Sequence, residues 1–320
     1  MLKRQYIPIF VTIGLFALMF AAGSFRYTGF FSLQVLLNLL IDNAFLLITA
    51  VGMTFVIVSG GIDLSVGSVI ALTTMISASL VQAGWSPAVV IPLVLVLGAA
   101  FGWGMGAMIH YFKIQPFIVT LAGMFLARGL CYMININTIT IDNPFYVAVA
   151  QTKIPLPGGS FITISVLIAL VVVLLGVYIA HYTRFGRNTY AIGGSEPSAI
   201  LMGLPVGLTK MGVYAMSGFC SALAGVVFTF YMLSGYGLHA MGMELDAIAA
   251  VVIGGTLLTG GVGYIVGTFF GVLMQGGIQT IISFEGTLSS WWTKIVIGLL
   301  LCLFILLQKW LSERRWAAKT

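Results

Sequence analysis

Residues 41–67 read IDNAFLLITAVGMTFVIVSGGIDLSVG, and this stretch decides the fold. Its first apolar run, 41–60, is long enough to cross a bilayer, because a transmembrane helix needs about 20 residues. Two glycines interrupt it, and a second apolar run follows at 64–82. Runs of this kind recur along a chain that is 60% hydrophobic, 7% charged and has a mean hydropathy of +1.12. With so few charges to form a water-facing surface, the sequence predicts a polytopic membrane protein.

We predict an all-α fold of about ten transmembrane helices in a single transmembrane domain, residues 1–320. Because several connections between runs are short, neighbouring helices there are expected to form antiparallel hairpins. The first run is long enough to span and is followed by nine others, so we expect an uncleaved helix rather than a removed signal peptide. The expected helices cover residues 6–24, 41–60, 64–82, 88–110, 116–135, 161–181, 211–232, 245–261, 264–283 and 293–310.

Basic residues in the loops predict that both termini are cytoplasmic, because Lys and Arg concentrate on the cytoplasmic side. In that orientation the outer side carries only Arg26 and Lys153, while Arg128 and Lys294 fall within or at the outer end of a span. No stripe or long basic arm is present, so the net charge of +6 does not indicate nucleic-acid binding. The inner side carries Lys3, Arg4, Lys113, Arg184, Arg187, Lys210, Lys309, Arg314, Arg315 and Lys319.

Two connections exceed hairpin length. The outer loop, 136–160, is rich in Pro and Gly, which favour an ordered, turn-rich cap over a helix. The inner loop, 182–210, is the most polar part of the chain and is the natural surface on which a cytoplasmic partner could dock. A short helix is expected there from Glu196 to Met202, since Ser195 can cap it and Pro197 suits its first turn.

The junction GGIDLSVG at 60–67 holds the most informative acid of the chain, Asp63. An ionised Asp at the centre of a bilayer costs about 2.5–3.5 kcal/mol on insertion scales, so it needs partners or an edge position. Gly60 and Gly61 let the backbone break, and Asp63 could then accept hydrogen bonds from N–H groups of the following helix. We expect a cap that fixes a helix break; the alternative is a direct part in a translocation gate. Ser65 and Gly67 complete the motif.

A second Gly-Gly pair opens GGVGYIVG at 260–267, where Gly again follows six residues later. The similarity hints at an internal repeat, which is common in transporters. Glycines spaced by four residues at 98, 102 and 106 are typical of helices whose backbones approach a neighbour closely.

Two further acids, Glu244 and Asp246, mark the expected outer start of the eighth span. A carboxylate there meets the positive end of the helix dipole, which is a stabilising position. The alternative interpretation is a docking contact for a partner outside the membrane. Arg128 is expected near the outer interface, with its guanidinium group directed at headgroups or a carboxylate.

Several activities are excluded or disfavoured. No Lys follows a Gly, so a P-loop that binds ATP is excluded. The three His and three Cys residues are scattered and give no catalytic, metal or disulfide spacing. All acids are expected near span ends or in loops, which argues against an ion-coupled carrier. We therefore predict no enzymatic activity and no bound cofactor, and expect any transport energy to arrive from another subunit.

The ordered motifs resemble the permease subunits of bacterial ABC sugar importers of the ribose type, and most of all galactofuranose importer permeases, which occur as one of two different permeases in their system. The resemblance extends over most of the chain. It rests on GGIDLSVG at 60–67, QPFIVTL at 115–121 with Arg128 and Gly129, TRFGR at 183–187 through Gly203, and AAVVIGGT at 249–256 with GGVG at 260–263 and Gly267-Thr268.

This resemblance implies a site and a set of partners. The segment from Glu196 to Gly203 would be a coupling helix in the cleft of an ATPase, and Arg184, Gly186 and Arg187 would shape its approach. Ser195, Glu196, Pro197 and Ser198 stand where relatives often have Asn followed by Glu-Ala-Ala. The implied partners are a second permease subunit, ATPase subunits that hold ATP and Mg²⁺, and a periplasmic sugar-binding protein, all at the bacterial inner membrane.

We therefore expect a passive permease for a pentose or hexose, with galactofuranose as the candidate. Its path would run along the interface between the two permeases, lined by the second and fifth spans and the Asp63 break. Two alternatives stay open: an amino-acid importer permease of similar architecture, and a stand-alone channel or ion-coupled carrier.

Overall fold

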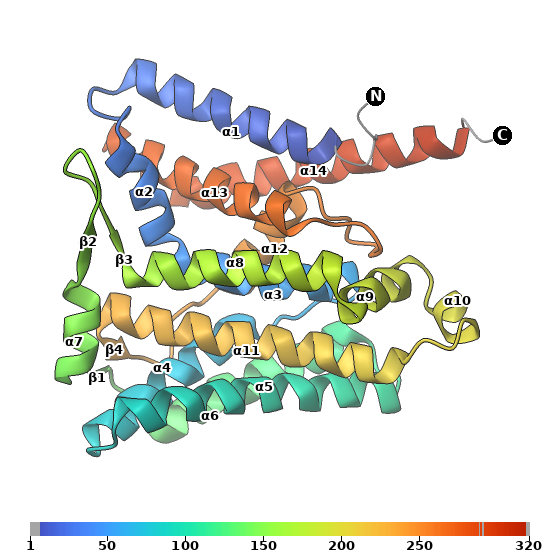
Figure 1. The fold of residues 1–320 in the computed structure, drawn as a ribbon, viewed down its shortest axis with the longest axis horizontal. Helices are drawn as coiled ribbons and strands as arrows, with labels where there is room; N and C mark the ends of the chain where they lie inside the picture. Colours follow the sequence, from blue (N-terminus) through green and yellow to red (C-terminus); the bar gives the residue numbers. More distant parts are fainter. Residues whose placement is uncertain (1–6, 288, 290, 318–320) are drawn as a thin grey trace.

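The computed structural model describes residues 7–287, 289 and 291–317, and the described chain is mostly helical (Figure 1). Lys3, Arg4 and Lys319, which contributed to the predicted orientation, lie outside the described residues. The helices are α1 (Ile7–Arg26), α2 (Leu33–Asp42), α3 (Ala44–Val58), α4 (Val66–Gln82), α5 (Pro87–Tyr111), α6 (Pro116–Ile134), α7 (Pro144–Gln151), α8 (Ile164–Tyr182), α9 (Arg184–Gly194), α10 (Glu196–Leu201), α11 (Val206–Met232), α12 (Met243–Ile253), α13 (Ile265–Glu285) and α14 (Trp291–Ala317).

Four short strands make two antiparallel pairs. Strand β1 (Ile139–Thr140) pairs with β4 (Ser234–Gly235), and β2 (Lys153–Pro155) pairs with β3 (Phe161–Thr163) as a hairpin. The first pair ties the loop after α6 to the segment after α11, far apart in sequence.

Six described helices, α1, α5, α6, α8, α11 and α13, are long and apolar enough to cross a membrane. A seventh span is possible if α2 and α3, which meet at a 60° bend, are counted as one. The expected polytopic helical fold is therefore confirmed. Several expected spans are shorter or interrupted: α4 has 17 residues and α12 only 11, because the chain leaves the helix at glycine-containing breaks next to each.

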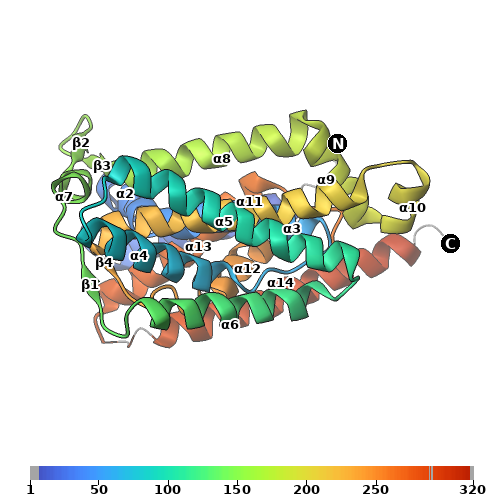
Figure 2. The same cartoon turned by 90° about the horizontal axis from the view of Figure 1, so that it is seen from below.

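The bundle has two distinct ends. Helices α9 and α10 lie at one, which we name the α10 end, and α7 with the β2–β3 hairpin lies at the other (Figures 1 and 2). Helix α1 begins and α14 ends on the side of the α10 end (Figure 1). Lys113 and Lys210 line one cavity beside α10, so these basic residues gather at the same end. This grouping fits the predicted cytoplasmic side, although the orientation itself stays a prediction.

Helix α11 runs through the centre and packs against α5 at unusually short range. The glycines at 98, 102 and 106 face it: a Cβ added at Gly102 would lie 2.1 Å from the carbonyl oxygen of Tyr214, and one at Gly98 would lie 2.6 Å from that of Gly218. The smooth face predicted from the four-residue spacing is therefore a real contact surface, which larger side chains would separate.

Both long loops contain helices that the sequence analysis did not predict. Helix α7 lies in the loop 136–160, where a turn-rich cap was expected instead; it starts because the Asn143 side chain accepts from the Phe145 N–H and Pro144 occupies the first turn. Helix α9 fills the polar start of 182–210, capped by the Thr183 hydroxyl, which accepts from the Gly186 N–H at 3.2 Å. In both, the local capping residues outweigh the composition of the loop.

Candidate functional site

Two interrupted helices meet inside the bundle. The chain is non-helical at 59–65 between α3 and α4, and again at 254–264 between α12 and α13. The Gly261 N–H donates to the Val58 carbonyl at 2.8 Å, and a Cβ at Gly260 would lie 2.9 Å from the Gly60 Cα. Gly60 and Gly260 have φ of +86° and +84°, a region that disfavours L side chains. The two similar Gly-Gly motifs are therefore in direct backbone contact.

Asp63 lies in the first break and is completely buried. One carboxylate oxygen accepts from the Ser65 N–H at 2.9 Å and the Ser65 hydroxyl at 2.6 Å, and the other accepts from the Ser217 hydroxyl at 2.7 Å. Ser65 is the N-cap residue of α4, so Asp63 holds the residue just before that helix rather than N–H groups of the helix itself. Within the described part of the chain no salt bridge reaches this carboxylate, which is held by hydrogen bonds alone.

The depth of Asp63 differs from the expectation that all acids lie near span ends or in loops. Its partner Ser217 is the twelfth residue of the 27 in α11, about 17 Å from the start of that helix at 1.5 Å per residue. Asp63 is thus deep in the bundle, and the sequence argument against ion coupling is wrong on this point. The reason is that α4 begins inside the protein, so the end of an apolar run is not the end of a crossing.

Irregular backbone is tolerated at membrane depth only where protein groups satisfy it. In the first break the Thr120 hydroxyl of α6 lies 3.3 Å from the Ile62 carbonyl oxygen, and its shorter contact, at 2.9 Å, is with the Pro116 carbonyl oxygen of its own helix. A second irregular segment, 233–242, connects α11 to α12. There Arg128 of α6 donates from Nη1 to the carbonyl oxygens of Gly237 at 2.6 Å and His239 at 2.9 Å. Arg128 therefore binds backbone carbonyls, partners that the sequence did not predict.

Glu244 and Asp246 have different surroundings, although both lie in the first turn of α12. The Glu244 carboxylate points inward, where a Cβ on Gly67 of α4 would lie 2.4 Å from its Oε2 atom. The first turn of α12 therefore lies against α4, and its position at an outer helix start stays a prediction. Asp246 pairs with Lys294 of α14 at 2.5 Å. An outer docking role for the two acids stays a prediction.

At the α10 end, the expected short helix is present. The Ser195 hydroxyl lies 2.8 Å from the Ser198 hydroxyl and accepts a hydrogen bond from the Ser198 N–H at 3.4 Å. Ser195 therefore caps α10, as the sequence indicates. Gly203 ends the helix with a φ of +74°. Glu196 forms a salt bridge with Lys210 of α11 at 2.7 Å, which holds α10 against the bundle.

The approach to α10 is basic. The side chains of Arg184 and Arg187 on α9 are exposed. Gly186 between them is buried, and a Cβ there would lie 2.3 Å from the Ala180 carbonyl oxygen, so glycine lets α9 fold back on α8.

The tip of α10 is apolar and uncovered. Ile200, Leu201 and Met202 are 57%, 88% and 66% exposed. A cavity of about 580 Å³ adjoins them, lined partly by His110, Lys113, Glu196, Ile200 and Lys210. Adjacent exposed apolar side chains beside charged ones are typical of a protein-binding surface.

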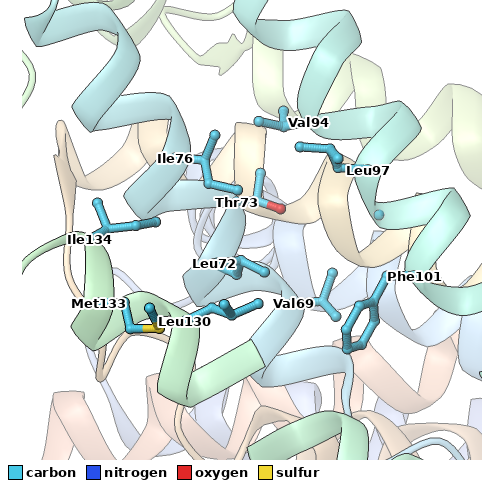
Figure 3. Close-up of a pocket in the computed structure, with 11 residues that line it drawn as sticks. Val69, Leu72, Thr73, Ile76, Val94, Leu97, Phe101, Leu130, Met133 and Ile134 are labelled. Atoms are coloured by element: carbon cyan, nitrogen blue, oxygen red, sulfur yellow. The ribbon is translucent and has the colours of Figure 1, made fainter. Parts of the chain in front are cut away.

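A second cavity, of about 340 Å³, lies between α4, α5 and α6 (Figure 3). Its lining is apolar except for the hydroxyl of Thr73, whose neighbours include Val69, Ile76, Leu97 and Phe101. Such a surface offers few hydrogen bonds to a polar solute. Among the described residues no group of three or more His, Cys, Asp or Glu could hold a metal ion.

Comparison with known proteins places this arrangement in a family. The family model described as "Branched-chain amino acid transport system / permease component" matches residues 35–305, which include both breaks, α9 and α10. The chain belongs to this permease family. Permease components of ABC transporters catalyse no reaction themselves, because ATP is hydrolysed by a separate subunit.

Individual relatives match this permease over nearly its whole length. The inner membrane ABC transporter permease protein YjfF of Escherichia coli K12 is 52% identical, covering 98% of this chain and 94% of its own. The fructose import permease protein FruG of Bifidobacterium longum is 41% identical, covering 96% and 92%. The ribose import permease protein RbsC of Haemophilus influenzae is 37% identical, covering 98% and 94%. No solved structure matches at comparable significance. The permease is thus a multi-span inner-membrane protein.

The permease fold brings together residues that the sequence kept apart. Asp63 and Ser217 are separated by 154 positions and Arg128 and His239 by 111. Neither Ser217 nor Gly193, which contacts both breaks, was singled out from the sequence. A Ser in an apolar run and a Gly in a polar loop are common, so only the tertiary contacts distinguish these two.

Proposed function

We propose that this permease translocates a sugar, a pentose or hexose, across the inner membrane as part of an ATP-driven importer. The observation that carries the proposal is that relatives named for fructose and ribose import align with nearly the entire chain. Within that class we favour galactofuranose, because the ordered sequence motifs resemble galactofuranose permeases most.

The energy would come from ATPase subunits that bind α10. Its exposed apolar tip and the exposed Arg184 and Arg187 offer a surface for such a partner at the α10 end, which the proposal places in the cytoplasm. ATP and Mg²⁺ would be held by the ATPase. A second permease subunit and a periplasmic sugar-binding protein would complete the importer.

In this scheme the permease provides a gated path and no chemistry. Closure of the ATPase pair on ATP would displace α10 and switch the permease pair between inward-open and outward-open states. The path would follow the interface between the two permeases, near the Asp63 break and the second and fifth predicted spans. Weak sugar binding in that path is sufficient, because the binding protein supplies selectivity.

An amino-acid importer is the second candidate, because the description of the matching family names branched-chain amino acids. Both candidates are tested by reconstituting the permease with its ATPase, its binding protein and its second permease, where there is one, in proteoliposomes. The assay measures ATP-dependent uptake of labelled galactofuranose, ribose, fructose and leucine. We expect uptake of one sugar and none of leucine. Uptake of leucine alone would establish the second candidate, and sugar uptake by the lone chain would support a stand-alone carrier.

A further inference from the structure

Gly193 of α9 lies against the end of α3, next to the first break, and against the second break at Gly261. A Cβ added there would lie 1.8 Å from the Val58 carbonyl oxygen and 2.6 Å from the Gly261 nitrogen. Those two atoms are the acceptor and donor of the hydrogen bond that joins the breaks. The end of α9, the end of α3 and the Gly260-Gly261 turn therefore meet backbone to backbone at a single point.

Further contacts hold the rest of α9 in the same place. The Tyr190 hydroxyl donates to the Gly263 carbonyl at 2.7 Å, and burial raises the pKa of this phenol to about 12, so it keeps its proton at physiological pH. The ring of Phe185 lies 6.2 Å from that of Phe55 on α3. Only Ser195 separates α9 from α10. Displacement of α10 therefore acts on a helix that is already packed against both breaks.

The contact at Gly193 leads towards the buried carboxylate. Asp63 follows Gly60 by three residues, and one of its carboxylate oxygens accepts from the Ser217 hydroxyl of α11. Backbone atoms in contact cannot avoid one another by changing rotamer, so a shift of α9 is passed to the α3 end. The hydrogen bonds of Asp63 with Ser65 and Ser217 connect that segment to α4 and α11.

We propose that Gly193 is a positioning residue for transport: it transmits movement of α10 to the break that contains Asp63. This inference rests on the proposed function, since it assigns a route between the ATPase-binding surface and the interior of the permease. The inference requires that position 193 carry no side chain, whereas the neighbouring position 194 needs no such restriction.

The neighbouring glycine supplies a matched control. A Cβ at Gly194 would have no heavy atom within 4 Å, so Gly194→Ala adds the same methyl group without a clash. Both variants are made in the complete importer in proteoliposomes, and the readout is the number of sugar molecules imported per ATP hydrolysed. In Gly193→Ala we expect assembly with the ATPase and ATP hydrolysis to persist while this ratio falls about tenfold or more, because the methyl group separates the three segments. Gly194→Ala should keep the wild-type ratio.

A second, milder substitution tests the same contact in case Gly193→Ala does not fold. Tyr190→Phe removes only the hydrogen bond to Gly263, and Tyr182→Phe, at an exposed tyrosine of α8, serves as its control. We expect the transport-to-hydrolysis ratio to fall in Tyr190→Phe and not in the control. If the variants that assemble import as many sugar molecules per ATP as their controls, the inference about Gly193 is overturned. In that case ATP-driven sugar uptake by the wild-type complex still supports the proposed function. Lack of ATP-driven sugar uptake by the wild-type complex overturns both.

Discussion

The Ser217→Ala variant tests whether the buried Asp63 carboxylate depends on its hydrogen bonds. The substitution removes the donor at 2.7 Å and leaves the two donors from Ser65. A hydrogen bond to a charged group contributes about 1.5–3 kcal/mol net. Loss of one therefore shifts the folding equilibrium by about 10- to 150-fold toward the unfolded state. In contrast, neutral side-chain hydrogen bonds in membrane helices average about 0.6 kcal/mol.

Ser221→Ala is the matched control, one turn further along α11. Ser221 is equally buried, but its hydroxyl donates to the Ser217 carbonyl within its own helix at 2.8 Å. Unfolding is followed by circular dichroism during titration with sodium dodecyl sulfate in mixed micelles. We expect Ser217→Ala to cost at least about 1 kcal/mol more than the control, and Asp63→Asn to abolish that excess by removing the charge. Equal costs for the two serine variants would refute the assignment of Asp63 as a charged acceptor.

Three other substitutions have defined outcomes. Glu196→Lys places a second cation beside Lys210, so we expect uptake to be lost while membrane insertion, measured by fractionation, is retained; normal uptake would contradict the docking of α10. Gly102→Ala forces a Cβ to 2.1 Å from a carbonyl oxygen of α11 and should cost about 1–3 kcal/mol in the same unfolding assay, whereas Gly104→Ala, with open space around it, should cost little. Arg128→Met leaves two loop carbonyls without their donor, so we expect faster cleavage of the segment 233–242 by a protease in micelles, and an unchanged rate would argue against that role.

Hydropathy alone was sufficient to predict a polytopic helical fold, because long apolar runs are incompatible with water whatever their partners. Ser195 and Pro197 were sufficient to predict α10, since caps act over a few residues. Hydropathy could not show that α4 and α12 begin inside the bundle. That depends on how the segments at 59–65 and 233–242 pack against other helices, which apolar content does not encode.

The candidate site was predicted in part. Asp63 was recognised from its rarity in an apolar chain, and its bond to the α4 N-terminus follows from local sequence. Its partner Ser217 could not be found in this way, because hydroxyl groups in membrane helices usually bond to their own backbone. The inward direction of Glu244 was missed for a similar reason. From sequence alone, an acid in the first turn of a helix is expected at the surface, because nothing local shows that another segment covers it.

The uncovered tip of α10 has a consequence for biogenesis. Under the proposed docking of the ATPase on α10, a copy of the permease without that partner would leave Ile200, Leu201 and Met202 in contact with water. Chaperones and proteases recognise such exposed apolar segments on unassembled subunits. Balanced synthesis of the subunits would then decide how many copies survive. An excess of this chain should shorten its own half-life, and supplying the missing subunit should restore it.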